Sequence, residues 1–191
     1  MAANRRTSLR SRRQTDHVIN HSVVDGPQYS WDADSIASLS RGALIFTASH
    51  NGKLIKGYIG RLLGNGTVHS FVGQFLPEKG LLGSPIKSES NEGSLYNDCE
   101  ILLDSNNKLC WKPIKDKFVP HSFNAIVANI ERDTDEKNVF IGKVTSEDGV
   151  GIGTIYSEGG WKINYCIQQE VQAKVIDLQN GGNNVEVLCL K

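Results

Sequence analysis

The side chains that could do chemistry are spread thinly along this chain of 191 residues. The histidines lack the close spacing of metal ligands and stand at positions 17, 21, 50, 69 and 121. Four acids share one expected turn, at 131, 133, 135 and 136, where they could hold Ca²⁺ or simply be solvated. The sequence contains no glycine-rich phosphate loop and no nucleophile elbow. It therefore predicts a protein that is not an enzyme, with no cofactor and no metal.

Two cations stand in matching surroundings. Arg61 lies in Gly-Tyr-Ile-Gly-Arg-Leu at 57–62, and Lys143 lies in Val-Phe-Ile-Gly-Lys-Val at 139–144, 82 positions later. Either cation could point into a binding cleft. The alternative is that each lies over an apolar strand or pairs with an acid.

The match between these two segments extends to their neighbours. Trp31 and Trp111 stand 80 positions apart, as do Gly73 and Gly153, and Glu-Ile-Leu at 100–102 corresponds to Glu-Val-Leu at 186–188. This spacing predicts a two-copy internal repeat. The two paired tryptophans could stack on a sugar or pack in the core. Trp161 has no counterpart in the first copy and follows two glycines, so its exposure stays open.

The elements that must position these residues are expected to be short strands. Branched and aromatic residues recur in short runs, and no long helical stripe is present. The expected strands cover 43–48, 56–62, 68–75, 99–103, 124–130, 139–144, 152–156, 161–167, 173–178 and 185–190. Glycine and asparagine separate these runs at hairpin-like turns. We expect a long loop with at most one strand over 78–98, and one short helical turn before residue 39.

The organisation that follows is an all-β fold of tandem repeats. We expect a basic arm at 1–30, a first repeat at 31–110 and a second at 111–191. Each repeat alone would bury too little surface to be stable. A pseudo-two-fold pairing into one compact body, with the copies intertwined and strands exchanged between them, would cover their faces and edges.

Charge and composition limit the partners. The chain has no net charge, but residues 1–16 carry five arginines against one aspartate. That arm could be a kinase target, a localisation signal, a nucleic-acid arm, a weak mitochondrial presequence or a solvated tail. It is the only candidate for binding nucleic acid, which is otherwise not expected. The sequence lacks a signal peptide and a spanning segment, which predicts a cytoplasmic protein without membrane insertion. Its four cysteines read as buried thiols.

The joint pattern resembles the DM-nine repeat family. The residues that carry it are the Trp that opens each copy, the Tyr-Ile-Gly-Arg phrase, the glycine of the next strand and Glu-aliphatic-Leu. The linking segment Cys-Trp-Lys-Pro at 110–113, with Val-Pro at 119–120 and Asn-Ala at 124–125, is also similar. The resemblance covers 31–191. It implies intertwined β-repeats and mannose-type glycan recognition in innate defence, with a glycan or microbial surface as partner and homo-oligomers as a further expectation.

The resemblance also implies where a sugar would bind. In the lectins of this family a carboxylate lies in a His-Asp turn, and a lysine follows the glycine of the next strand. Here the first turn reads His50-Asn51 and the residue after Gly73 is Gln74. The second turn keeps the acid as Asp133. The residue after Gly153 is Thr154.

The candidate ligand-binding residues are therefore Asn51, Gln74, Asp133, Thr154, His50, Arg61 and Lys143. Amide and hydroxyl groups can both donate to and accept from sugar hydroxyls. The alternative function is a protein-interaction or scaffold module that has lost sugar binding.

Overall fold

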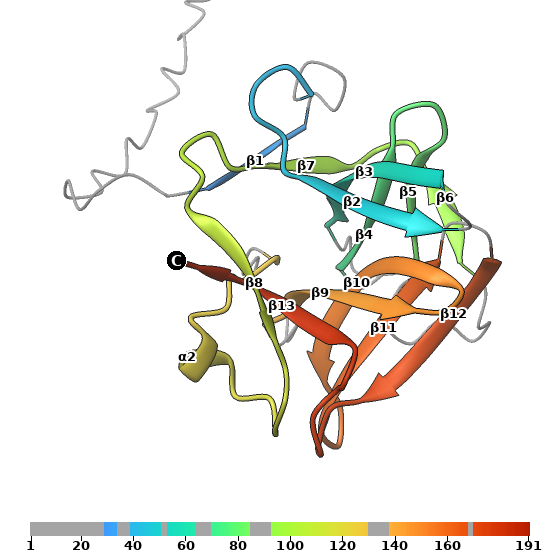
Figure 1. The fold of residues 1–191 in the computed structure, drawn as a ribbon. Coiled ribbons are helices and arrows are strands. Elements are labelled where there is room, and N and C mark those ends of the chain that lie inside the picture. The colour runs from blue at the N-terminus through green and yellow to red at the C-terminus, as the bar shows by residue number, and fades with distance from the viewer. Residues whose placement is uncertain are drawn as a thin grey trace, which may run out of the picture.

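The protein is an all-β structure of two antiparallel sheets, which confirms the fold class that the sequence predicts. The computed structural model describes residues 29–33, 39–50, 53–63, 70–84, 93–129, 138–167 and 170–191. In Figure 1 the blue-to-green strands form the upper sheet, and the orange and red strands belong to the lower one. The C-terminus lies beside β8 (Leu109–Pro113), the strand of the second sheet that follows the first sheet in the chain.

The first sheet has seven strands. Their order is β1-β7-β3-β4-β5-β6, and β2 also pairs with β3. The strands are β1 (Ser30–Asp32), β2 (Ile45–His50), β3 (Lys53–Leu62), β4 (Phe71–Leu76), β5 (Gly80–Gly83), β6 (Ser94–Tyr96) and β7 (Glu100–Leu103).

The second sheet has six strands, in the order β8-β13-β9-β10-β11-β12. They are β8 (Leu109–Pro113), β9 (Phe140–Ser146), β10 (Gly149–Ser157), β11 (Trp161–Ile167), β12 (Glu170–Asp177) and β13 (Val185–Leu190). A four-residue helix, α2 (Pro120–Phe123), lies between β8 and β9 in the chain.

The registers of the two sheets agree at the residues that repeat in the sequence. Gly60 lies opposite Gly73 in the first sheet, and Gly142 lies opposite Gly153 in the second. The tryptophans behave in the same way, since Trp31 lies opposite Leu102 and Trp111 opposite Leu188. The cations lie opposite acids, Arg61 across from Glu100 and Lys143 across from Glu186.

Two glycines let neighbouring strands come close. A methyl group on Gly73 would lie 2.2 Å from the carbonyl oxygen of Leu82, and one on Gly153 would lie 2.1 Å from the carbonyl oxygen of Asn164. Both obstacles are backbone atoms of the adjacent strand, so only a hydrogen fits at either position.

The core that joins the halves lies between the sheets. It contains Ile59, Val72 and Leu102 of the first sheet together with Ile141 and Ile152 of the second. Strands β4 and β10 face each other across it. All of β4 is buried, and β10 is buried except for its second and last residues. These two strands therefore form the centre of the molecule.

The segment 124–130 differs from the expected strand. It follows α2, and Ala125 and Val127 make only isolated bridges, to Cys189 and Phe140. Proline suits the first turn of a helix because its fixed φ is already helical. Asn124 ends the turn with φ 57°, a left-handed conformation that asparagine tolerates. Pro120 and Asn124 therefore specify a helical turn directly before the expected strand, whose described residues make isolated bridges and no ladder.

The loop expected over 78–98 contains two strands, β5 and β6. Gly80 and Gly83 flank the Leu-Leu of β5, and glycines so close together are typical of a turn. In the structure this segment is a strand that pairs with β4. The strands β1 and β8, which carry the two repeated tryptophans at the sheet edges, were not among the expected strands.

The halves do not exchange strands in the described ladders, contrary to our expectation. The first sheet is built from 30–103 and the second from 109–190. The contacts between them are made by side chains. This corrects the intertwined arrangement to two sheets that pack on each other.

Several expectations lie outside the described residues: the arm up to residue 28, the helical turn at 34–38 and the acidic turn at 131–136. Within the described ranges, no helix has the length and apolar character needed to cross a membrane.

Candidate functional site

Arg61 is part of the framework between the halves. Its side chain is only 4% exposed and forms an ion pair with Glu100 on β7. A second nitrogen donates to the carbonyl oxygen of Ala128, in the other half of the chain. The guanidinium carbon lies 4.2 Å from the ring centre of Trp31. These contacts use most directions of the guanidinium, as expected of a buried cation that holds elements together.

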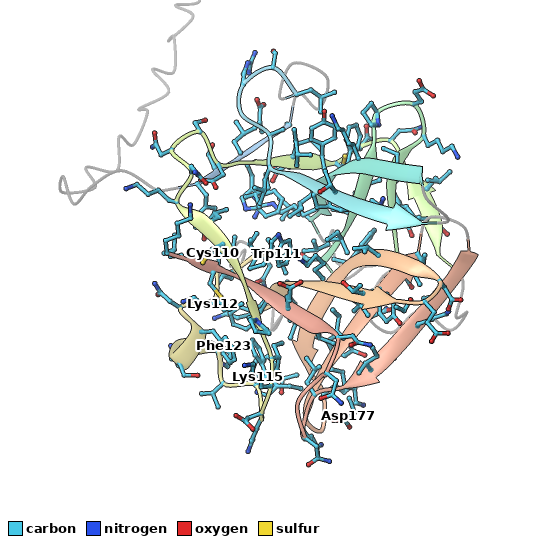
Figure 2. The ribbon with its side chains drawn as sticks, in the orientation of Figure 1. Cys110, Trp111, Lys112, Lys115, Phe123 and Asp177 are labelled. Carbon is cyan, nitrogen blue, oxygen red and sulfur yellow. The ribbon has the colours of Figure 1, made fainter. Side chains whose placement is uncertain are left out.

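Lys143 has the corresponding arrangement in the second sheet. It pairs with Glu186 on β13, and its Nζ lies 4.9 Å from the ring centre of Trp111. We considered that these cations could point into a binding cleft or could lie over an apolar strand or pair with an acid. In the structure both pair with an acid. Trp31 and Trp111 pack against the core between the sheets, which is the structural reading of both rings. Figure 2 labels Trp111 on β8.

Thr154 connects the sheets through its hydroxyl. The hydroxyl accepts from the amide of Val72 at 2.7 Å and donates to the carbonyl of the same residue at 3.3 Å. The described ladder between β4 and β5 begins at Gln74 and does not reach Val72. The hydroxyl of Thr154 therefore bonds the backbone groups of Val72 that the ladder with β5 does not reach. Thr154 is fully buried.

Gln74 is also fully buried, and neither its amide nitrogen nor its amide oxygen has a hydrogen-bond partner among the described residues. A methyl group on Gly57 would come within 3.2 Å of its Nε2, which shows how closely it is packed. A neutral amide at this depth costs less than the ammonium that the family resemblance would place there.

The other predicted residues are only partly visible. His50 ends β2, and its side chain lies outside what the structure describes, as do Asn51 and Asp133 entirely. The pairs Asn51 with Gln74 and Asp133 with Thr154 therefore stay predictions. What the structure does bring together is β4 with β10, the strands that carry Gln74 and Thr154.

The described residues offer little for catalysis. They contain no group of three or more histidines, cysteines or acids that could hold a metal ion. Burial raises the pKa of Cys99, Cys166 and Cys189 to about 11. For Cys99, burial is the largest cause of the raised pKa, and the carboxylates of Asp98 and Glu100 contribute to it as well. Such thiols stay protonated near neutral pH and are poor nucleophiles.

Trp161 and Ser157 line two neighbouring clefts at one end of the second sheet. The first, of about 480 Å³, is lined by residues of α2, the segments after α2 and before β9, and the strands β9, β10 and β11: Pro120, His121, Asn124, Ala125, Val127, Asn138, Phe140, Ser157 and Trp161. The second, of about 440 Å³, is lined by Lys117, Ser157, Gly160, Trp161, Gln179 and Asn180. Figure 2 labels Phe123 on α2, the helix whose Pro120 and His121 line the first cleft.

Trp161 is half-buried and held by aromatic neighbours. Its ring centre lies 5.1 Å from that of Phe118 at 90° and 5.7 Å from that of Phe140 at 62°. Phe118 is fully buried. Edge-to-face contacts of this kind fix the orientation of a ring. The tryptophan is therefore already in place before any ligand arrives.

The turn before Trp161 is held by hydrogen bonds. The amide of Glu158 donates to the carbonyl of Gly160 at 2.9 Å. The side-chain amide of Gln179 donates to the carbonyl of Gly159 at 3.1 Å, and the amide of Leu178 donates to the carbonyl of Trp161 at 2.8 Å. Gly160 has φ 143°, a conformation that L-residues rarely adopt.

Sequence reasoning found Trp161 only as an open question. The signal was a tryptophan after two glycines with no counterpart in the first copy. Phe118, Asn138 and Gln179 gave no signal, because they reach this place from three separate segments.

No protein-family model, curated protein or solved structure matches this chain.

Proposed function

We propose that this protein is a non-enzymatic carbohydrate-recognition protein built from two copies of one DM-nine-like repeat. Support for the duplication comes from the sheets, which have corresponding strand orders and place the repeated glycines, tryptophans and cation–acid pairs in corresponding registers. Gly73 and Gly153 also approach the backbone at corresponding residues, Leu82 and Asn164. In this proposal the repeated residues are framework, and the ligand binds where the copies differ.

One observation carries the carbohydrate assignment: the half-buried Trp161, which is held by aromatic neighbours and lines two clefts. An aromatic ring offers an apolar face to the C–H side of a sugar. The amide and hydroxyl groups around it, from residues such as Asn124, Asn138 and Ser157, can donate to and accept from sugar hydroxyls.

The test is calorimetric titration of the full chain with mannose and with mannan. Trp161→Ala should weaken mannan binding at least about fivefold, because a stacked aromatic contact contributes about 1 kcal/mol beyond its buried area, and about 1.4 kcal/mol corresponds to a factor of ten. Trp161→Phe should retain part of the affinity. The control is Leu95→Ala, on β6 of the other sheet, which should bind as the wild type does.

Far-ultraviolet circular dichroism must first show that each variant is folded. Folded Trp161→Ala with wild-type affinity would refute the assignment of the site. Absence of binding to mannan and to the other glycans used below would refute the carbohydrate function itself.

A protein-interaction module is the second candidate. The observation that favours it is that Leu95 on β6 and Val175 on β12 are each 54% exposed on the outer described strands of the two sheets. Outer strands with apolar side chains can pair with another chain. If no glycan binds, sedimentation of the wild type and of a Leu95→Lys, Val175→Lys double variant tests this candidate. Self-association that the double variant abolishes would support it.

A further inference from the structure

Because Trp161 and Ser157 line two clefts and not one, the geometry points to an oligosaccharide as the ligand, with one sugar unit in each cleft. This inference rests on the proposed function and narrows it. The clefts share Ser157 and Trp161 as a common wall, so a single chain molecule can occupy both. Each cleft alone falls in the usual size range of small-molecule sites, roughly 300 to 1,000 Å³.

The Trp161 side chain and the turn before it are held in place by their neighbours. Phe140, which lines the first cleft, and the buried Phe118 both contact the Trp161 ring. On the side of the second cleft, Gln179 packs on Gly160, where a methyl group would lie 2.2 Å from its Nε2. Because Trp161 is already ordered, little conformational entropy is lost at this side chain on binding. This favours a ligand that contacts both clefts.

Both clefts contain neutral hydrogen-bonding groups, although the first also has the apolar side chains of Pro120, Ala125, Val127 and Phe140. Apart from the shared Ser157, the polar residues of the first are His121, Asn124 and Asn138, and those of the second are Gln179, Asn180 and Lys117. None is a carboxylate, and most are neutral groups that both donate and accept. Repetition of neutral hydrogen-bonding groups in both clefts suits a ligand whose units repeat. The ammonium group of Lys117 adds a donor at one end only.

The experiment compares monosaccharides with trisaccharides on the full chain by calorimetry. Three series serve as probes: mannose and mannotriose, glucose and cellotriose, and N-acetylglucosamine and chitotriose. In at least one series the trisaccharide should bind about tenfold more tightly than the monosaccharide, because it adds the hydrogen bonds and contacts of the second cleft.

Two variants test each cleft alone, Asn138→Ala in the first and Asn180→Ala in the second. Each should weaken the trisaccharide about three- to tenfold, as loss of one hydrogen bond does, whereas at most one should affect the monosaccharide. Asn183→Ala, an exposed asparagine outside both clefts, is the matched control and should change neither.

The outcomes separate the two claims. If a monosaccharide binds as tightly as its trisaccharide, or if neither asparagine variant weakens the trisaccharide, the two-unit ligand is wrong while carbohydrate recognition stands. The same holds if both variants weaken the monosaccharide and the trisaccharide equally. If no sugar of any series binds, both claims fail.

Discussion

At the scale of single residues, Arg61 and Lys143 make similar contacts but differ in how deeply they are buried. Both pair with an acid and lie over a tryptophan. Arg61 also binds the carbonyl of Ala128 and is 4% exposed, whereas the side chain of Lys143 is 19% exposed. Removing one member of a buried pair leaves its partner without compensation, while an exposed pair contributes little. The two cations should therefore differ in their contribution to stability.

We predict that Arg61→Met lowers the free energy of unfolding by about 3–5 kcal/mol, because Glu100 and the Ala128 carbonyl lose their partner. Lys143→Met should lower it by about 1 kcal/mol. Urea unfolding followed by fluorescence measures both. Arg61→Lys keeps the charge but cannot bridge Glu100 and Ala128 together, so it should fall between wild type and Arg61→Met. Equal losses for Arg61→Met and Lys143→Met would contradict this account.

At the scale of elements, the central strands depend on glycines that admit a neighbouring backbone. Gly73 and Gly153 lie in the two strands that face each other across the core. Neither can take a methyl group without moving the adjacent strand. Gly159 differs, because a methyl group there would meet nothing within 4 Å although φ is 63°.

Gly153→Ala should destabilise the protein by about 3 kcal/mol, since a rigid backbone atom blocks the new methyl group. Gly159→Ala, the control, should cost about 1 kcal/mol from its left-handed conformation alone. The midpoint of urea unfolding is the readout. A midpoint for Gly153→Ala at or above that of Gly159→Ala would show that the strand spacing is not what requires glycine.

Much at this scale was predictable from sequence. The repeated phrase marks strands β3 and β9, and the turn glycines divide the chain into short strands, because both signals are local. The strands β5 and β6 were missed because glycine flanks one and polar residues surround the other. The role of Thr154 could not be foreseen, since it depends on where the ladder of β5 ends relative to Val72. The Trp161 clefts were out of reach for the same reason: their walls come from segments distant in the chain.

At the scale of the whole molecule, the residues that match between the halves and the residues that could bind a ligand are different sets. The matched tryptophans pack against the core, and the matched cations are paired with acids. Trp161 has no match, is half-buried and borders two clefts. We therefore expect the repeated residues to stabilise the fold and the ligand to bind at residues that differ between the two halves.

The most direct test of that division uses the chain's three tryptophans, each with one indole N–H that nuclear magnetic resonance can follow. Mannotriose, cellotriose and chitotriose are titrated in turn into the ¹⁵N-labelled full chain, and the three assigned indole signals are recorded. We predict that the Trp161 signal shifts with a saturable dependence on at least one trisaccharide, while those of Trp31 and Trp111 stay in place. Shifts at Trp31 or Trp111 with Trp161 unmoved, or no shift at any of the three, would contradict the account.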